Sequence, residues 1–307
     1  MSAGLPRISI CIATYRRPQK LALLLQDLAA QTLPPTQIVV VDNDAAQSAR
    51  GIVEAARRAA PDIAVLYATQ PEKNIALTRN LSIALADGDW LALVDDDERA
   101  PHDWLARLAE AADRYCADGV LGPVLPVLPA HAPDWIRRGR FYDWTRLRSG
   151  SVVPPNRLRL GNALLSAAAL RSVPGPFDPA YGLTGGEDGD LLARLALLDV
   201  RLVWCDEAGV QEPVDDSRLS LRWLLRRALR GGQDYARHTL AGRYGPPTLR
   251  RRVQLAARAG AQLLLAALLV LAMAPLGRHR AARWLVAASA NLGKLSLFWG
   301  WHYREYA

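Results

Sequence analysis

The sequence predicts an α/β protein whose mixed, mainly parallel sheet is flanked by helices and followed by a C-terminal helical, membrane-associating region. Over residues 7–67, short β-branched runs alternate with segments of helical periodicity, which is typical of parallel strands with helical crossovers. Polar and acidic residues follow several of these runs, where the carboxyl ends of parallel strands form a ligand crevice. After residue 235, arginines and long apolar runs dominate. We therefore expect two regions, residues 1–235 and 236–307.

The first part of the chain alternates strands and helices. Residues 7–13 are dense in β-branched side chains and predict the first strand. Pro18 occupies the favoured first position of a helix whose leucines recur at helical spacing. Residues 37–41 predict a second strand, a helix follows to about residue 60, and residues 63–67 predict a third strand. This order predicts a parallel sheet with right-handed crossovers.

An acidic triplet ends the central strand. The apolar run of residues 90–94 predicts a short buried strand, and Asp95, Asp96 and Asp97 follow it directly. Adjacent aspartates repel unless a cation lies among them, and Mg²⁺ and Mn²⁺ prefer carboxylate oxygens that they share with substrate phosphates. The pattern therefore predicts a divalent cation that carries phosphate at this strand end. The alternative is a solvated acidic turn that caps the next helix.

Polar residues also follow the first two strands. Thr14 and Tyr15 come after the first strand and Asp42 after the second, where a nucleotide base and ribose would fit. Asp42 would accept a hydrogen bond from a base N–H or a ribose hydroxyl, and the alternative is that Asp42 or Asp44 caps the following helix. Farther along, Asn74 and Arg79 could reach phosphate, although Arg79 could equally be a surface arginine.

The middle of the chain is less regular. Residues 119–128 predict a strand that contains prolines and therefore lies near a sheet edge. Residues 129–155 form a long loop rich in Trp, Arg and Tyr, and loops of this kind are more often functional than filler. Its Trp135 and Trp144 could stack on sugar rings, or they could pack in a small core that holds the loop down. Residues 161–166 predict another strand.

A glycine pair precedes two carboxylates and a helix. Gly185 and Gly186 allow a backbone to approach a ligand closely and make Glu187 and Asp188 accessible. A carboxylate there, across from the acidic triplet, could serve as a general base. The alternative is that the helix dipole stabilises both carboxylates at a helix N-terminus. A last strand is expected at residues 201–205.

Composition excludes several classes of protein. The 307 residues, 50% of them hydrophobic, suffice for one large domain or two. A net charge of +8 suits nucleic acid or an anionic membrane, and since no segment alternates aromatic with basic residues, we expect a membrane surface and no nucleic acid. Neither the dinucleotide-binding glycine fingerprint nor a P-loop is present. The cysteines, Cys11, Cys116 and Cys205, indicate reduced thiols, and residues 1–7 do not resemble a signal peptide, so we expect a cytosolic location.

The C-terminal part predicts helices at a membrane. Residues 219–230 combine arginines with large apolar residues, which is typical of a helix on an anionic membrane, or of a helix that covers an acceptor groove. Residues 259–277 are uncharged and only just long enough to span a bilayer. Arginines flank both ends, which disfavours a simple span and favours a re-entrant or in-plane pair with residues 284–301. The alternative is a soluble helical subdomain.

Five of these motifs, in order over residues 7–235, together resemble family 2 glycosyltransferases of the GT-A fold. Residues 41–45, 185–188 and 223–233 are similar to the ExoM-like branch, which works in succinoglycan-type exopolysaccharide assembly. The five motifs are Ala13-Thr14-Tyr15, Val41-Asp42-Asn43, Asn74 with Arg79-Asn80, Asp95-Asp96-Asp97 and Gly185-Gly186-Glu187-Asp188.

The resemblance implies inverting transfer of a sugar from a nucleotide diphosphate sugar, a UDP-sugar above all, to a hydroxyl of a polyprenyl-linked or other glycan acceptor. It implies Mg²⁺ or Mn²⁺ bound by Asp97 with Asp95, and Asp188 as the base with Glu187 beside it. It also implies a peripheral or monotopic enzyme at the cytoplasmic face of the cell membrane. The residues implied to bind nucleotide sugar are Ala13, Thr14, Tyr15, Asp42, Asn74, Arg79, Asp95 and Asp96. The residues implied to lie on the acceptor side are Gly185, Gly186 and Trp223.

Two departures from the family pattern leave alternatives open. Many relatives carry a histidine metal ligand after the final strand, where this chain has Gln211 and Glu212. Processive members carry a Gln/Arg-x-x-Arg-Trp motif, and here Leu219 takes its first position ahead of Arg222 and Trp223. We therefore expect transfer of one sugar at a time. The competing classes are a degenerate GT-A module that only binds nucleotide, and a metal-dependent nucleotidyltransferase, which would usually bring a glycine-rich basic N-terminal loop.

Overall fold

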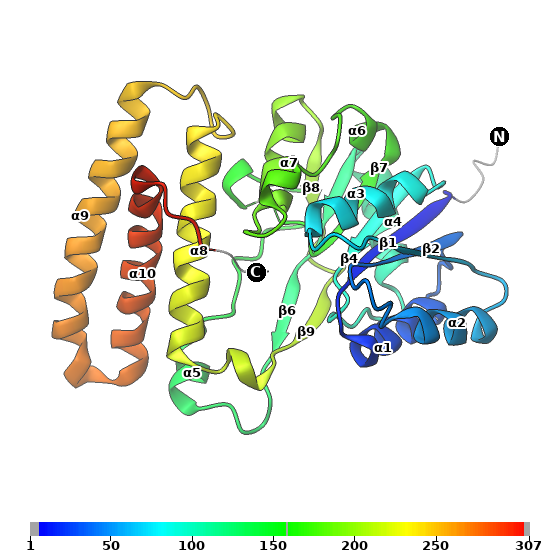
Figure 1. Cartoon of the computed structure of the whole chain (residues 1–307), viewed down its shortest axis with the longest axis horizontal. Coiled ribbons are helices and arrows are strands. Elements are labelled where there is room, and N and C mark those ends of the chain that lie inside the picture. Colours follow the sequence, from blue (N-terminus) through cyan, green and yellow to red (C-terminus); the bar gives the residue numbers. More distant parts are fainter. Residues whose placement is uncertain (1–5, 158, 304–307) are drawn as a thin grey trace.

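A seven-stranded sheet forms the centre of the protein and a bundle of three long helices stands beside it (Figure 1). The structure is a computed structural model that describes residues 6–157 and 159–303. Most of the N-terminal stretch on which the absence of a signal peptide was judged, residues 1–5, lies outside the described residues. The strand order is β3-β2-β1-β4-β7-β5-β8, and β6 and β9 form a separate two-stranded sheet.

The first four strands are those the sequence predicts, and they pair in parallel as β3-β2-β1-β4. Strands β1, β2 and β4 are buried on both faces of the sheet, which explains their continuous apolar runs, whereas β3 at the edge is partly exposed. Thr14 pairs with Asp42 in the β1–β2 register, so the ends of these strands lie level. The four strands are β1 Ile8–Thr14, β2 Gln37–Asp42, β3 Ala64–Thr69 and β4 Trp90–Val94.

Helices cover both faces of the sheet. The leucines of α1, together with α2 and α4, pack on the face formed by Ile10 and Ile12. Helices α3, α6 and α7 pack on the opposite face, where Leu91 and Leu93 lie. These helices are α1 Pro18–Ala29, α2 Arg50–Ala59, α3 Ile75–Leu85, α4 Trp104–Arg114, α6 Ala167–Arg171 and α7 Glu187–Leu197. Short 3-10 turns lie at Pro155–Arg157, Pro179–Tyr181, Asp216–Arg218, Ala274–Leu276 and Leu297–Trp299.

We expected one strand near a sheet edge at residues 119–128, and this expectation is wrong because the segment forms two strands. The chain leaves the sheet at Gly122-Pro123, and the two halves join different sheets. The first half is paired on both sides, by β7 and β8, so it is interior; the second half pairs with β9 and contains Pro126. The strands of this part are β5 Gly119–Leu121, β6 Val124–Val127, β7 Asn162–Ser166, β8 Leu202–Trp204 and β9 Val210–Pro213.

The long loop of residues 129–155 contains helix α5, Asp134–Gly139, and packs mainly in a small core of its own. Trp135 packs edge-on against Phe141, and Tyr142 stacks on Trp223 with 5.8 Å between ring centroids. For Trp135, the alternative of a small core is therefore the one that the structure bears out. Trp144 is 37% exposed, with the guanidinium of Arg227 5.0 Å from its ring.

The three long helices are α8 Leu221–Leu240, α9 Leu249–Met273 and α10 Arg278–Ser296. Helix α10 packs against both α8 and α9, and α8 lies nearest the sheet (Figure 1). The boundary expected between residues 235 and 236 falls inside α8, so the bundle begins before it. Among the described residues, one helix, Leu249–Leu276, is long and apolar enough to cross a membrane by length and composition, and 11% of its apolar window is buried.

Candidate active site

A cavity of about 310 Å³ opens where β1 and β4 end, and α3 and α8 contribute to its walls. Because β1 and β4 run in parallel, their carboxyl ends meet at one edge of the sheet, which is where ligands bind in open α/β folds. The structure thus brings together residues that lie far apart in the sequence. The predicted site residues that line the cavity are Ala13, Thr14, Tyr15, Asn74, Arg79, Asp95, Asp96, Asp97 and Trp223.

Each aspartate of the triplet has cationic or hydroxyl partners within the chain. Arg79 donates to Asp95 Oδ1 over 2.8 Å. Asp96 accepts from the hydroxyl of Thr14 over 2.8 Å and from Arg17 over 3.1 Å. Burial nevertheless raises the pKa of the Asp96 carboxyl to about 6, against the opposing charge of Arg17. The alternative of a solvated acidic turn does not describe Asp96, which is 4% exposed.

Asp97 is the most heavily paired member of the triplet. Its Oδ2 accepts hydrogen bonds from Arg17 over 3.0 Å and from Arg218 over 3.1 Å, and Lys20 Nζ lies 3.9 Å away. Arg218 also pairs with Glu212 and so joins β9 to the acidic triplet. Glu212 lines the cavity, and it is one of the two residues that stand where the family resemblance implies a histidine. Positive charge thus already gathers around the carboxylate predicted to hold a metal.

The donor set at the triplet suits a hard divalent cation. Asp95 and Asp97 present carboxylate oxygens to the same cavity, and Mg²⁺ is commonly held by one or two carboxylates together with substrate phosphates. In the part of the chain that the structure describes, no three His, Cys, Asp or Glu side chains form a preassembled metal cage. The residues therefore fit a cation that arrives with phosphate ligands, and such a cation would share Asp97 with Arg17 and Arg218.

Arg79 connects the acidic triplet to the glycine-rich turn. Besides its bond to Asp95, its Nε lies 3.6 Å from the carboxylate of Glu187, the first residue of α7. The Glu187 side chain is 5% exposed. Burial and the neighbouring charge of Asp188 raise the pKa of Glu187 to about 7, while Arg79 acts in the opposite direction. The buried carboxyl of Glu187 can therefore hold a proton near neutral pH, and it lies next to Arg79, which lines the cavity.

Asp188 does not line the cavity, but its charge acts on the carboxyl of Asp95, which does. The pKa of the Asp95 carboxyl is raised by desolvation and then by the charges of Asp97 and Asp188, against Arg79. Asp188 also acts on Asp234 of α8, whose pKa burial raises to about 7. Asp188 is partly exposed and accepts, through Oδ1, only the backbone N–H of Gly189 among the bonds seen here. Its carboxylate is therefore more accessible than that of Glu187.

The turn before α7 needs glycine at two positions. Gly185 and Gly186 have φ of 79° and 94°, in the left-handed region that favours glycine. A Cβ at Gly186 would lie 2.8 Å from Oδ1 of Asp234, so the turn approaches α8 closely. His238 Nε2 donates to the carbonyl of Gly186 over 2.9 Å and fixes the turn from the same helix. Neither glycine lines the cavity.

Asp42 does not line the cavity. The side chain is fully buried, and it accepts from the backbone N–H groups of Asp44 and Ala49 over 2.9 and 2.8 Å and from the Tyr67 hydroxyl over 3.0 Å. These bonds hold the segment that leads into α2, but the N-cap of that helix is Ala49 and no side chain caps it, so the capping alternative is wrong for Asp42. Asn74 does line the cavity, but its Oδ1 caps α3 by accepting from the N–H of Leu77.

Helix α8 supplies cavity residues from the segment for which two alternatives were open, a helix on a membrane surface and a helix that covers an acceptor groove. Arg227 and Arg230 line the cavity beside Trp223, so for these side chains the structure supports the alternative of a helix that covers the groove. Trp223, Arg227, Arg230 and Asp234 are spaced so that they lie on one face of the helix. This spacing could have shown from the sequence that these four residues face the same way. The other lining residues given no role there are Arg17, Asn43, Lys73, Ile75, Glu212 and Arg218.

Comparisons with known proteins agree with this geometry. The family model described as "Glycosyl transferase family 2" matches residues 9–159. The chain is 38% identical, over 239 residues, to the succinoglycan biosynthesis protein ExoM of Rhizobium meliloti (strain 1021). That alignment covers 75% of this chain and 74% of the relative.

Solved structures share the fold. The mannosyltransferase PcManGT of Pyrobaculum calidifontis, in complex with GDP-Man and Mn²⁺, matches with a TM-score of 0.66 at 21% identity, over 96% of this chain and 87% of that one. TarS 1-349 of S. aureus, in complex with UDP, matches with a TM-score of 0.55 at 20% identity, over 97% and 93% of the two chains. The expected mainly parallel sheet flanked by helices, of the GT-A type, is thereby confirmed.

Proposed function

Because this chain belongs to glycosyltransferase family 2, we propose that it transfers one sugar at a time from a nucleotide diphosphate sugar to a hydroxyl of a lipid-linked or other glycan acceptor, with inversion. Its relative acts in succinoglycan biosynthesis, and a role in polysaccharide synthesis follows from that kinship. The observation that carries the proposal is the position of Arg79, which pairs with Asp95 at the end of β4 and with Glu187 at the start of α7.

In this proposal the cavity holds the donor. Thr14, Tyr15 and Arg79 line it together with Arg227 and Arg230, so guanidinium groups face the space where a diphosphate would lie. A UDP-sugar is the favoured donor. Asp42, buried behind the strand ends, would reach a base only by exchanging one of its present hydrogen bonds.

Mg²⁺ or Mn²⁺ would be held by Asp97 with Asp95. When bound, such a cation neutralises the negative charge that develops on the leaving diphosphate. Within the chain, Arg17 and Arg218 would hold Asp97 in place, since both guanidinium groups donate to its Oδ2. Glu212 is the further carboxylate on the cavity wall, paired with Arg218.

Asp188 would take the proton from the acceptor hydroxyl as its oxygen attacks the anomeric carbon. Its partial exposure would let an acceptor hydroxyl approach it at the end of the glycine turn. Glu187 would act by holding Arg79 rather than by taking the proton, because its side chain is buried. Gly185, Gly186 and Trp223 would border the acceptor. The enzyme would work at the cytoplasmic face of the membrane, attached through its helical region.

The test is a pair of adjacent substitutions assayed with purified full-length protein, a panel of nucleotide sugars and detection of released nucleotide. Asp188→Asn should lower transfer at least about a hundredfold while donor binding and melting temperature stay near the parent values. Glu187→Gln should lower it less. If Asp188→Asn transfers at the parent rate while Glu187→Gln is inactive, the base is the neighbouring residue. If both variants are active, the proposed site is wrong.

A further inference from the structure

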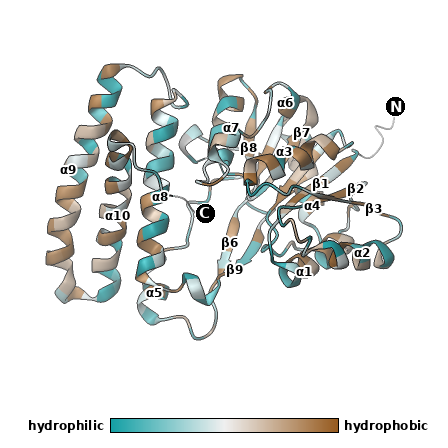
Figure 2. Ribbon diagram, in the orientation of Figure 1, coloured by the Kyte–Doolittle hydropathy of each residue, from teal (hydrophilic) through white to brown (hydrophobic). Residues whose placement is uncertain are grey.

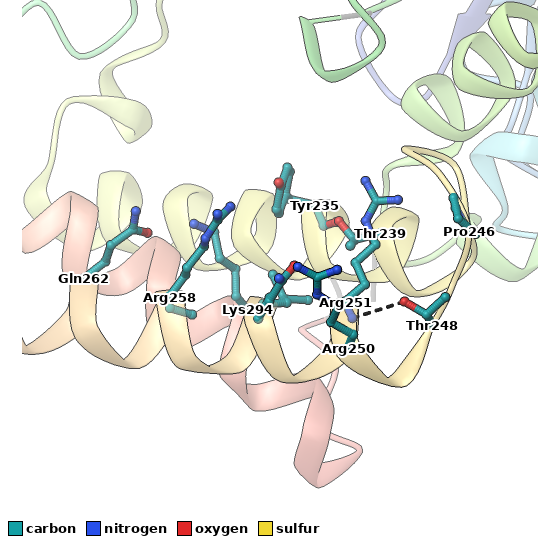
Figure 3. A pocket seen from close by; sticks show the side chains of 12 residues that line it. Tyr235, Thr239, Pro246, Thr248, Arg250, Arg251, Arg258, Gln262 and Lys294 are labelled. Atoms are coloured by element: carbon teal, nitrogen blue, oxygen red, sulfur yellow. Dashed lines mark hydrogen bonds between the residues drawn. The ribbon is translucent and has the colours of Figure 1, made fainter.

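A second, larger cavity lies within the helical bundle, away from the candidate active site. It has a volume of about 550 Å³ and lies between α8, the N-terminal half of α9 and the C-terminal end of α10. Figure 3 shows side chains from all three helices around it. Its cationic lining residues are Arg250, Arg251, Arg258 and Lys294, and no Asp or Glu lines it.

These four cations have no acidic partners in the part of the chain that the structure describes. Arg251 donates to the backbone carbonyl of Tyr244, and Lys294 donates to the side-chain amide of Asn291 over 2.9 Å. Arg250 and Arg258 make no ion pair with any described carboxylate. Four like charges around one cavity repel one another, and an anion in the cavity would remove that repulsion.

Uncharged groups of the cavity also favour an anion. Thr248 caps α9 by accepting from the N–H of Arg251 over 3.3 Å, so the positive end of this 25-residue helix opens on the cavity. The hydroxyl of Thr239 and the amide of Gln254 lie in the same lining. Guanidinium, ammonium, hydroxyl and amide N–H groups together match the oxygens of a phosphate or diphosphate.

The same helix continues from the cavity into an exposed apolar surface. Leu264, Leu268 and Leu271 of α9 are 70, 66 and 74% exposed. Figure 2 shows the hydrophobic colour along the half of α9 that lies beyond the cavity. At 1.5 Å per residue, Leu264 to Leu271 extend from about 9 to about 20 Å beyond Arg258. A phosphate carried by a hydrocarbon chain could bind the basic half of α9 and also cover its exposed leucines. A free phosphate could bind only the basic half.

The cavity is connected to the turn that precedes the proposed base. Arg251 donates to the carbonyl of Tyr244, the Tyr244 hydroxyl lies 3.2 Å from Nδ1 of His238, and His238 Nε2 donates to the carbonyl of Gly186. A chain of hydrogen bonds through His238 of α8 therefore links the cavity to the acceptor side of the proposed active site.

We propose that this cavity binds the phosphate or diphosphate group of a membrane lipid, whose hydrocarbon chain lies along the apolar half of α9. The lipid is the carrier of the glycan acceptor, and in this respect alone the proposal rests on the proposed function. Arg250 and Arg258 contribute the charges that are open to such a ligand, and Lys294 closes the cavity from α10.

The test measures binding of the full-length protein to phosphatidylcholine vesicles with and without farnesyl diphosphate, by flotation. The double variant Arg250→Gln/Arg258→Gln should bind the diphosphate vesicles at least about tenfold more weakly than the parent. The matched control Arg252→Gln/Arg280→Gln removes the same charge from exposed positions on α9 and α10 outside the cavity and should stay within about twofold. Equal losses in the two double variants would overturn the site, because they would show attraction by general surface charge.

Inorganic pyrophosphate separates the two sources of the anion. If it displaces the parent from the diphosphate vesicles at concentrations comparable with farnesyl diphosphate itself, the cavity binds free phosphate and the lipid half of the proposal fails. Arg250→Lys/Arg258→Lys, which keeps both charges, should recover most of the binding, and circular dichroism shows whether each variant is folded. Nucleotide-sugar binding by the parent is measured in parallel: its absence would contradict the proposed function and leave the lipid result standing.

Discussion

The two basic cavities of this protein differ in how their positive charge is balanced. In the cavity at the strand ends, Arg17, Arg79 and Arg218 each donate to a carboxylate of the acidic triplet. In the cavity of the helical bundle, Arg258 and its neighbours face one another with no carboxylate in the lining. In the first cavity four carboxylates balance much of the charge of the six lining cations. The second cavity has four cations and no carboxylate, so an external anion would be needed to balance its charge.

This difference separates two uses of arginine. Buried pairs fix the positions of their partners, and breaking one is costly because it leaves a charge without compensation. Exposed, unmatched arginines add little to stability but attract anions and respond to salt. We therefore expect the strand-end cavity to be sensitive to any loss of charge, and the bundle cavity to tolerate such losses except in ligand binding.

The largest expected effect is at Asp97. Asp97→Asn should lower sugar transfer by about a thousandfold or more, since a metal contributes several kcal/mol of charge stabilisation and each 1.4 kcal/mol is tenfold in rate. EDTA should have the same effect on the parent. The assay is release of nucleotide, with Asp216→Asn as the control because Asp216 is exposed and pairs only with His131 among the described ion pairs. Parent-like activity in EDTA would remove the metal from the proposal.

Loss of Arg79 tests the strand-end cavity, in which arginines are paired with carboxylates. Arg79→Gln leaves Asp95 and the buried Glu187 without their shared cation, and the free energy of unfolding should fall by about 3 kcal/mol. Urea unfolding measures this loss. Adding Glu187→Gln to the same chain should recover part of it, because one of the uncompensated carboxylates is then absent. Strictly additive effects of the two substitutions would show that the pair does not interact.

Protonation of Glu187 should make stability depend on pH. Its pKa is raised from the ordinary value of 4.5 to about 7, so the folded state holds a proton that the unfolded state has lost. The stability that this proton provides is complete below about pH 4.5 and is lost as the pH rises through 7. Relative to Glu187→Gln, the parent should therefore lose a few degrees of melting temperature between pH 5 and pH 8. Glu110→Gln, at an exposed position, should show no such change, and a constant difference across this range for Glu187→Gln would contradict the raised pKa.

Much of the sheet and of the strand-end cavity could be predicted from the sequence because local patterns determine them. The β-branched runs of β1 and β2 and the apolar run of β4 are buried on both faces, so each strand is visible without knowledge of its neighbours. Asp95 follows β4 directly, and a parallel sheet brings its strand ends together whatever the details of the connections. These two facts suffice to assemble the acidic triplet beside Thr14.

The remaining features depend on contacts between distant segments, which periodicity does not reveal. Prolines in residues 119–128 suggested an edge, yet β5 ends before Pro123 and is paired on both sides. The arginines of α8 suggested either a membrane surface or a helix that covers a groove, and only the folded chain shows that Arg227 and Arg230 line the cavity. The buried bonds of Asp42 and the unmatched lining of the bundle cavity likewise appear only when the chain is folded.

The smallest expected effect is at Arg258, and it completes the comparison with Arg79. Arg258→Gln removes an exposed cation that has no acidic partner among the described residues, so it should change the free energy of unfolding by no more than about 0.5 kcal/mol. At low ionic strength the sign should be stabilising, because repulsion from Arg250 and Lys294 is relieved. In 0.5 M NaCl the change should vanish, since charges several ångströms apart are then screened. Urea unfolding of parent and variant at the two salt concentrations measures both statements. A loss as large as that of Arg79→Gln would mean that Arg258 is matched within the fold, and the bundle cavity would then have no excess charge to offer to a lipid phosphate.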